Sequence, residues 1–277
     1  MVRLFSEVLG EEVTLPERPT RIVSFSPAVT ETLFKIGAGR RLVGASAFCA
    51  RPPEAAGVRK VGSYSTVRPE LLDELKPDLI LTVTGYQRDF ARALSDKYPV
   101  YPLELPVTVA GIVDLVVKVG LVIGEPDAAR EVGGALLCGL GRVKKARNLR
   151  TYIEIDLGGP VTFGAHSYIT DAVNLVGCSN VYGAERSEWL TPDLDLVKAR
   201  DPDVIFYEAK MYSRFGKSDL DSLVRSRNWD AMRAVARGNC LLTPGPLDFL
   251  AHHGPSFVIE TIPWLQEKFG EAERRLS

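Results

Sequence analysis

An internal repeat limits what this chain can fold into more than any other feature of its sequence. Each copy contains a short apolar strand, a small turn, an amphipathic run closed by glycine, a second run closed by proline, and another apolar strand. The first copy occupies residues 21–83 and the second occupies residues 161–207. Strand alternating with helix, twice over, predicts two α/β lobes with mainly parallel sheets.

Three pairs of residues punctuate the two copies at matching places. The glycines suit the left-handed conformation that closes a helix. The first proline of each copy fits the first helical position, where its missing N–H is harmless. The second proline ends a helix, because proline cannot continue the backbone hydrogen bonding. These pairs are Gly37 and Gly177, Pro69 and Pro192, and Pro77 and Pro202.

The segment between the copies predicts two helices, over residues 109–123 and 127–148, separated by a Gly-Glu-Pro break. We expect the second to be one long helix that links the lobes; the alternative is a peripheral helix. Asp127 can cap its start. Basic residues near its end favour the helix dipole, and they are Arg142, Lys144, Lys145 and Arg147. The expected domains are 1–107, 108–149 and 150–277.

Composition argues against several classes of function. The 277 residues include 34 basic and 35 acidic side chains, and the net charge of −1 disfavours broad binding to nucleic acid or anionic membrane. No apolar run of eighteen residues occurs, so we expect no membrane span. The four cysteines form no CxxC pair, which disfavours a zinc ribbon or a thioredoxin-like site. Their pairing stays open, free thiols included; they are Cys49, Cys138, Cys178 and Cys240.

The first twelve residues do not resemble a secretory signal, because they contain no apolar core and no small-residue cleavage site. Either the protein stays in the cytosol or a signal has been removed.

Signatures of common enzymes are missing: the sequence has no GxSxG elbow, no phosphate-binding GxxxxGK[ST] loop and no HExxH. Glu208 and Lys210 follow a strand end, where a catalytic pair could lie, but such a pair is more typical of a binding cleft. We therefore expect no enzyme and no catalytic cofactor. A metal site of the chain's own is also not expected, because only three histidines are present and two of them are adjacent. They are His166, His252 and His253.

Several stretches resemble the solute receptors that feed ABC importers of cobalamin, haem and ferric siderophores. They are RIVSFSPAVTETLFKIG (21–37), VGSYSTVRPELLDELKPDLILTVT (61–84), GEPDAAR (124–130), WLTPDLDLVKARDPDVIF (189–206) and GPS (254–256). The cobalamin-type members are the most similar. Residues 51–55 resemble their loop with paired prolines, and Trp189 precedes Asp195 by six residues, as in those members a cleft tryptophan precedes an acidic docking residue. Tyr64 departs from this pattern, since another tryptophan is usual at its place.

The resemblance implies an α/β fold of two Rossmann-like lobes, joined by a single long backbone helix. It also implies a monomeric receptor outside the cytoplasm, periplasmic or at the cell surface, which captures a corrinoid such as cobalamin between its lobes and delivers it to an ABC permease. The alternatives are a haem or ferric-siderophore receptor, or a cytosolic corrinoid carrier or sensor on the same fold.

A broad, flat macrocycle with polar edges calls for aromatic faces and a few polar groups. Candidates follow strands or lie in loops between the repeated parts, where open α/β sheets bind ligands. They are Ser26, Phe48, Tyr64, Tyr86, His166, Trp189 and Phe249. The alternatives are core packing for the aromatic residues, a helix cap for Ser26, and a structural or hydrogen-bonding role for His166 rather than axial ligation of bound iron or cobalt.

Glu70 and Asp195 each precede the closing proline of their copy by seven residues. In the receptors that the chain resembles, such a pair of acids docks against arginines of the permease. Asp193 competes with Asp195, because it directly follows Pro192 as Glu70 follows Pro69. Alternatively, these acids simply favour a helix amino terminus.

Overall fold

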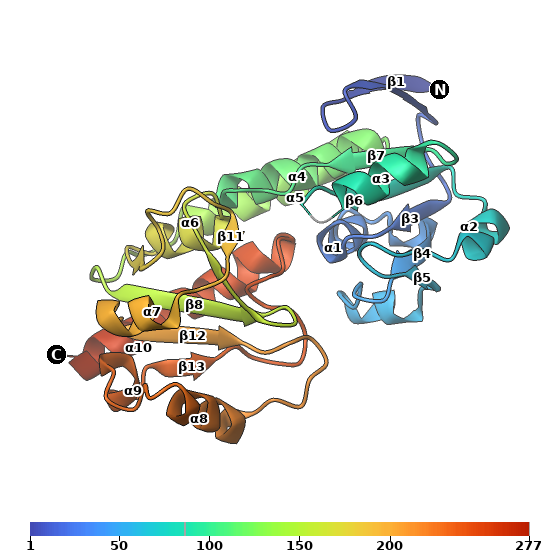
Figure 1. The fold of residues 1–277 in the computed structure, drawn as a ribbon. Coiled ribbons are helices and arrows are strands. Elements are labelled where there is room, and N and C mark those ends of the chain that lie inside the picture. The colour runs from blue at the N-terminus through green and yellow to red at the C-terminus, as the bar shows by residue number, and fades with distance from the viewer. Residues whose placement is uncertain (86, 277) are drawn as a thin grey trace. The chain divides into compact units, whose positions relative to one another are not determined.

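A computed structural model describes residues 1–85 and 87–276 of the chain. The chain forms two compact α/β units (Figure 1). Unit 1 comprises Met1–Pro106 with Ala110–Cys138, and unit 2 comprises Val107–Val109 with Gly139–Ser277. Helix α5 (Pro126–Leu140) therefore runs from the first unit into the second.

Unit 1 is built on a five-stranded sheet in the order β5-β4-β3-β6-β7, and all of its strands are parallel. The central strands are buried at every residue, as their continuous apolar sequences predict. The strands are β3 (Ile22–Ser24), β4 (Leu42–Ser46), β5 (Lys60–Gly62), β6 (Leu79–Val83) and β7 (Val100–Leu103). The helices that accompany α5 are α1 (Pro27–Lys35), α2 (Pro69–Leu75), α3 (Arg88–Ser95) and α4 (Val109–Val122), with the 3-10 turns η1 (Gly39–Arg41) and η2 (Pro53–Gly57).

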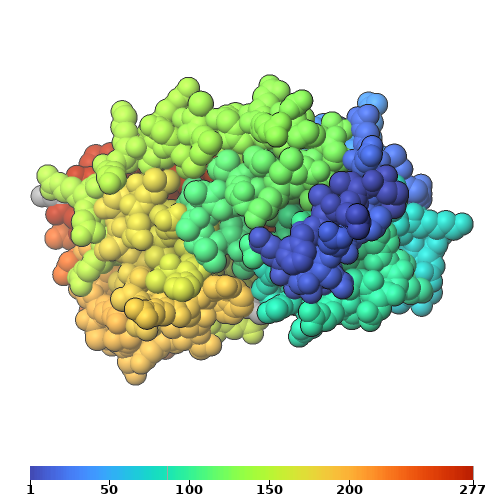
Figure 2. Space-filling model, turned by 90° about the horizontal axis from the view of Figure 1, so that it is seen from above, coloured from blue at the N-terminus to red at the C-terminus, as the bar shows by residue number. Residues whose placement is uncertain are grey.

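A separate antiparallel hairpin, β1 (Val2–Ser6) with β2 (Glu11–Leu15), begins the chain. It lies on the surface of unit 1, where Figure 2 shows it in dark blue. Its apolar residues Val2, Leu4 and Val13 pack against the core of that unit, and the hydroxyl of Tyr101 donates to the carbonyl oxygen of Phe5 at 3.1 Å.

Unit 2 contains a six-stranded mixed sheet, with the path β11-β9-β8-β12-β13 and β10 paired to β8. Strands β10, β8, β12 and β13 are parallel, whereas β9 runs antiparallel to β8 and β11 runs antiparallel to β9. The strands are β8 (Arg150–Asp156), β9 (Pro160–Phe163), β10 (Ser179–Asn180), β11 (Trp189–Leu190), β12 (Val204–Glu208) and β13 (Cys240–Leu242). The helices are α6 (Tyr168–Leu175), α7 (Leu194–Arg200), α8 (Lys217–Ser226), α9 (Arg233–Ala236), the π-helix η3 (Phe257–Thr261) and α10 (Ile262–Leu276).

The prediction that the second copy starts at residue 161 is wrong by one strand. Strand β8, not β9, pairs with β12 as β3 pairs with β6. The hairpin turn after β8 sends the chain back as the added antiparallel strand β9, and Gly158 makes this possible with φ of 101°. The order β10-β8-β12-β13 then matches β4-β3-β6-β7.

Matching hydrogen bonds support this alignment of the copies. The Asp78 carboxylate accepts the N–H of Arg21 at 2.8 Å, at the start of β3, and the Asp203 carboxylate accepts the N–H of Arg150 at 2.8 Å, at the start of β8. Each aspartate directly follows the proline that closes the preceding helix. One carboxylate in each unit thus ties the beginnings of two neighbouring parallel strands together.

The predicted helix ends are confirmed at four of the six punctuating residues. Gly37 and Gly177 have φ of 78° and 88° and follow α1 and α6. Residues 76 and 201, at the ends of α2 and α7, are left-handed directly before the two closing prolines. Pro69 begins α2, which adds a fifth agreement. Pro192 is the exception. The Asp193 side chain caps α7, so the helix begins at Leu194 and not at the proline.

The observed helix is shorter than the one predicted over 127–148, because α5 ends at Leu140. Two glycines flank this residue, and glycine lowers helix propensity by about 1 kcal/mol. Beyond them the backbone has partners in unit 2: the N–H of Lys144 donates to the Gln266 side chain at 3.0 Å, and the N–H of Ala146 donates to the Val176 carbonyl at 2.8 Å. The basic residues at 142–147 therefore lie in a turn and an irregular segment rather than on a helix.

The four cysteines are free thiols, and only Cys138 is exposed. In the part of the chain that the structure describes, no helix is both long and apolar enough to cross a bilayer.

Candidate functional site

Three of the predicted contact residues of unit 1 follow neighbouring strands at the same edge of the sheet. Ser26 comes after β3, Phe48 after β4 and Tyr64 after β5. Because these strands are parallel, their carboxyl ends meet at one edge, which is where open α/β sheets bind ligands. Tyr86, the fourth candidate, lies outside the described residues.

Phe48 and Tyr64 form an aromatic pair at this edge. Their rings are stacked, with centroids 4.7 Å apart and planes inclined by 21°, and both residues are half-buried. The N–H of Phe48 donates to the Ser46 hydroxyl at 3.3 Å, which fixes the turn that carries its ring. The pair gives unit 1 an apolar patch of the kind that a flat macrocycle contacts.

Gln87 holds this edge together and was missed by the sequence analysis. Its side-chain nitrogen donates to the carbonyl oxygens of Phe25 at 3.0 Å and of Tyr64 at 2.8 Å, while its side-chain oxygen accepts the N–H of Val83 at 2.8 Å. At 3% exposure it is a buried crosslink between the ends of β3 and β6 and the turn after β5. Its only sequence signal is a polar residue shortly after a buried strand.

Ser26 acts as the cap of α1. Its hydroxyl accepts the N–H of Val29 at 3.4 Å, and the residue is 1% exposed. The structure thus supports the alternative interpretation of this residue, a helix cap, rather than a ligand contact.

In unit 2, His166 and Trp189 lie on two segments joined by backbone hydrogen bonds. The N–H groups of residues 164–166 donate to carbonyl oxygens in the segment 185–188, at 2.7–3.3 Å. Gly164 permits this approach, because a Cβ atom there would lie 2.5 Å from the carbonyl oxygens of Glu185 and Ser187. His166 is exposed, and Trp189 is half-buried at the start of the edge strand β11.

Phe249 lies in the core of unit 2. Its ring is 8% exposed and meets the ring of Trp264 edge-on, with centroids 5.3 Å apart. The structure therefore agrees with core packing, the alternative interpretation, for this aromatic residue.

Glu208, at the end of β12, fastens the loop that carries Phe249. Its carboxylate accepts the N–H groups of Phe249 at 3.0 Å, of Ala251 at 3.2 Å, and of Leu250. Burial raises the pKa of the Glu208 carboxyl to about 7, although the three N–H donors act in the opposite direction. Lys210 is exposed instead. Glu208 thus has a structural role, and nothing in its geometry pairs it with Lys210 for catalysis.

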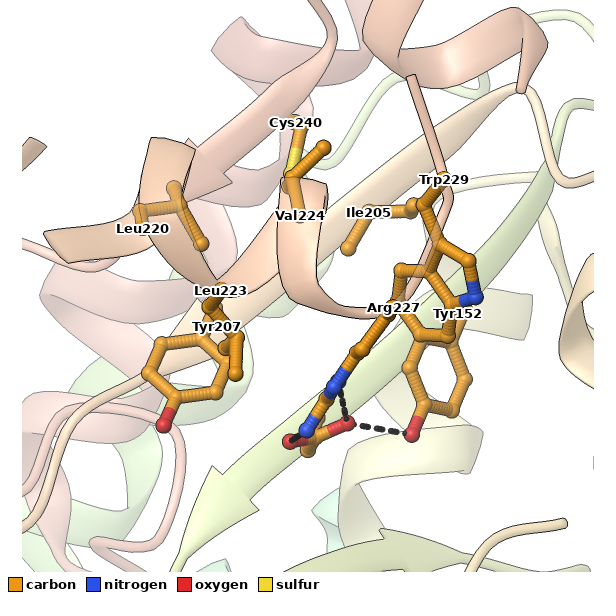
Figure 3. Close-up of a pocket in the computed structure, with 10 residues that line it drawn as sticks. Tyr152, Ile205, Tyr207, Leu220, Leu223, Val224, Arg227, Trp229 and Cys240 are labelled. Carbon is orange, nitrogen blue, oxygen red and sulfur yellow. Dashed lines mark hydrogen bonds and ion pairs between the residues drawn. The ribbon is translucent and has the colours of Figure 1, made fainter. Parts of the chain in front are cut away.

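A second buried carboxylate lies between the sheet of unit 2 and α8 (Figure 3). The guanidinium of Arg227 donates two hydrogen bonds to Glu154, each 2.7 Å long, and the Tyr152 hydroxyl donates a third at 2.6 Å. The guanidinium also lies 4.9 Å from the ring centre of Trp229. The adjoining cavity has room for about one water molecule, so it is too small for a macrocycle.

The two predicted docking acids have equivalent places. Glu70 is the second residue of α2 and Asp195 is the second residue of α7, and both are exposed. The carboxylate of Asp193, the competing candidate, accepts the N–H groups of Asp195 and Leu196 at 3.0 Å each. Asp195, rather than Asp193, therefore has the helix position that is equivalent to that of Glu70.

Within the residues that the structure describes, no three His, Cys, Asp or Glu side chains are grouped so that they could hold a metal ion. Desolvation of the half-buried His253 ring, together with the neighbouring His252, lowers the pKa of His253 to about 4. Nδ1 of His252 lies 3.5 Å from the Asp248 carboxylate.

Comparison with known proteins gives a consistent result. Residues 22–247 match the model of the family described as periplasmic binding protein. A vitamin B12-binding protein of Yersinia pestis (strain Pestoides F) is 26% identical over 200 residues, which cover 70% of this chain and 71% of that protein. The crystal structure of the periplasmic vitamin B12 binding protein BtuF of Vibrio cholerae has a TM-score of 0.72 at 19% identity, covering 92% of this chain and 98% of that one. The periplasmic heme-binding protein RhuT of Roseiflexus sp. RS-1, in its apo form, has a TM-score of 0.75 at 18% identity, covering 91% and 98%.

Proposed function

This chain belongs to the periplasmic binding protein family, and from that premise we propose that it is a receptor outside the cytoplasm that binds a corrinoid and passes it to an ABC importer. The observation that carries the proposal is the stacked pair of Phe48 and Tyr64 at the carboxyl edge of the unit 1 sheet. Binding removes much of the apolar surface of a macrocycle from water, and aromatic side chains are the most effective way to cover that surface.

Unit 2 would supply the second aromatic contact. Trp189 is half-buried, and the hydrogen bonds of its segment to residues 164–166 fix the place of its backbone. We propose that Trp189 is the aromatic contact that unit 2 makes with the ligand. His166, exposed beside the Trp189 segment, would add a polar group.

The alternative ligand is haem or a ferric siderophore. It is favoured by Tyr64, whose phenol is smaller than the indole usual in cobalamin receptors and carries a hydroxyl group. The fold does not choose between these ligands, because its relatives of known structure include both a vitamin B12 binding protein and a heme-binding protein. If the protein is instead in the cytosol, the alternative function is that of a corrinoid carrier or sensor.

Delivery would use Glu70 and Asp195. Each is exposed at the second position of its helix, and these helices are equivalent in the two copies of the repeat. Two separated negative charges orient a receptor on its permease better than one, although each exposed ion pair contributes only about 0–1 kcal/mol.

A ligand titration followed by tryptophan fluorescence tests the proposal. Hydroxocobalamin should quench the emission with one-to-one stoichiometry, and most of the quenching should vanish in the variant Trp189→Phe. The other two tryptophans serve as internal controls, because Trp229 is buried in unit 2 and the half-buried Trp264 packs against Phe206 there. Binding of haem without binding of any corrinoid would replace the corrinoid proposal by its alternative, whereas binding of neither would remove the receptor proposal.

A further inference from the structure

We propose that the loop after β12 recognises an acidic group on the rim of the bound chelate, through Lys210, Tyr212 and Arg214. This inference rests on the proposed function and makes it more specific, because it names the chemical group by which unit 2 selects its ligand. Of these three residues, the sequence analysis singled out only Lys210, as part of a polar pair typical of a binding cleft, and it did not consider Tyr212 or Arg214.

The loop has a defined place in unit 2. Strands β8, β12 and β13 are parallel, so their carboxyl ends form one edge, and Figure 1 shows their arrowheads pointing the same way. The loop leaves β12 at this edge, and the N–H of Tyr212 donates to the Pro246 carbonyl, in the loop after β13, at 2.8 Å. A turn closed by the N–H of Ser213 on the Lys210 carbonyl, at 2.9 Å, separates Lys210 from Arg214.

Lys210 and Arg214 are positive charges without a carboxylate partner. Both are exposed, and within residues 1–85 and 87–276 neither forms an ion pair. Every acidic residue in the segments 208–221 and 243–252, and at the end of β8, already has another partner. The carboxylates and their partners are Glu208 with the N–H groups of 249–251, Asp219 with the N–H of Gly216, Asp221 with Lys217, Asp248 with His252, and Asp156 with the N–H of Gly158. Two cations at a binding edge, with the local acids occupied, favour an anionic group from outside the chain.

Tyr212 adds an aromatic face held in an uncommon conformation. Its side chain is 55% exposed, and its backbone has φ of 65°, in the left-handed region that non-glycine residues seldom adopt. Such strain persists where a function uses the side chain that the conformation displays. Leu157, 52% exposed in the turn after β8, gives the same edge a further apolar contact.

A flat, apolar macrocycle with an acid on its rim fits this combination of an exposed ring and two cations. The acid is the phosphodiester of the nucleotide arm if the ligand is cobalamin, and a propionate carboxylate if it is haem. The chemistry is shared, namely an anionic oxygen that accepts charge-assisted hydrogen bonds, and matched ligands distinguish the two sources.

The test compares each ligand with a counterpart that lacks the acid. Cyanocobalamin is paired with dicyanocobinamide, which has no nucleotide phosphate, and haem is paired with haem dimethyl ester. We expect the variant Lys210→Gln/Arg214→Gln to bind the acidic member of the pair about 10–100-fold more weakly, as the loss of one or two charge-assisted hydrogen bonds predicts. Its affinity for the member without the acid should stay within about threefold of wild type, since no charge pair is lost there.

The matched control is Arg142→Gln/Lys145→Gln. It removes the same number of positive charges from exposed positions that precede β8 in the chain. It should bind every ligand as wild type does, which separates a local contact from a general effect of net charge. Raising the salt concentration should weaken the binding of the acidic ligand by wild type more than by the loop variant.

The outcomes separate this inference from the proposed function. If wild type binds a macrocycle and the loop variant binds both members of the pair as wild type does, the inference is overturned and the receptor proposal stands. If the loop variant loses both members equally, the loop contacts the macrocycle but not its acid, which also overturns the inference. If wild type binds none of the four ligands, the proposed function fails and this inference with it.

Tyr212→Gly supplies an independent test. Glycine adopts a positive φ without strain, so the melting temperature should stay equal or rise, while affinity for the macrocycle should fall about 5–50-fold through loss of the aromatic contact. A lower melting temperature with unchanged affinity would show that Tyr212 is there for folding and not for the ligand.

Discussion

The buried pair of Arg227 and Glu154 predicts a large loss of stability when only one partner is removed. In Arg227→Met, the Glu154 carboxylate stays 1% exposed and keeps only the hydrogen bond from Tyr152. The two lost bonds, each 2.7 Å long and charge-assisted, contribute about 1.5–3 kcal/mol each. Because an uncompensated buried charge remains, we expect the free energy of unfolding to fall by about 3–5 kcal/mol.

Removing both partners should cost far less. In Glu154→Leu/Arg227→Met no buried charge is left, and apolar side chains of similar length can fill the space between the sheet and α8. We expect this variant to recover most of the loss and to lie within about 2 kcal/mol of wild type. Urea unfolding followed by circular dichroism measures each free energy, and Glu154→Leu completes the double-mutant cycle.

Two results would contradict this prediction. If Arg227→Met costs less than about 1 kcal/mol, then the pair behaves as an exposed ion pair does, and the burial of Glu154 has been misjudged. If the double variant is as unstable as the sum of the single ones, then the two residues do not interact.

Three further predictions concern ligand binding, delivery and pH. Trp189→Ala should weaken binding by about 1–3 kcal/mol in calorimetry, as the loss of an aromatic anchor does, without a matching change in melting temperature. Glu70→Arg with Asp195→Arg should leave ligand affinity unchanged but abolish uptake in vesicles that contain the cognate importer; normal uptake would refute the docking role. Folding raises the pKa of Glu208 from about 4.3 to about 7, so the folded state holds a proton that the unfolded state has released. The stability that this proton contributes is fully present below about pH 4.3 and is lost as the pH rises through about 7. Wild type should therefore lose stability relative to Glu208→Gln between pH 5 and 7, by up to about 1.4 kcal/mol per pH unit, and parallel curves would contradict this.

Much of the fold could be predicted because its signals are local. Glycine after an amphipathic run, proline after a second run, and an apolar strand each have a physical cause within a few residues. The repeat therefore predicted two α/β units and the helix ends at Gly37 and Gly177. Glu70 and Asp195 also reached equivalent positions, because their spacing to the closing proline fixes their place in the helix.

The errors arose where distant residues decide the structure. Strand β8 was missed because its sequence, RTYIEID, has Glu154 among its apolar residues and so lacks the continuous apolar run that marks the other buried strands. The charge of the buried Glu154 is compensated by Arg227, which reaches it from the end of α8, 73 residues later. The second linking helix was extended too far because Gln266 and Val176, which take up the backbone beyond it, come much later in the sequence.

The candidate site shows the same division. Phe48 and Tyr64 could be predicted as candidates because aromatic residues after strands are visible in the sequence, although their stacking was not. Phe249 has the same signal, yet Trp264 and the anchoring by Glu208 place it in the core. Gln87 gives almost no signal, since its three partners lie at the ends of other elements.

Equilibrium binding of cyanocobalamin to the purified chain, measured by isothermal titration calorimetry, tests the central claim most directly. We expect a single site with a dissociation constant of roughly micromolar or below, and an affinity that falls in Trp189→Ala and in Tyr64→Ala. It would be contradicted if no heat of binding appeared with cyanocobalamin, dicyanocobinamide or haem, at ligand concentrations up to about 1 mM.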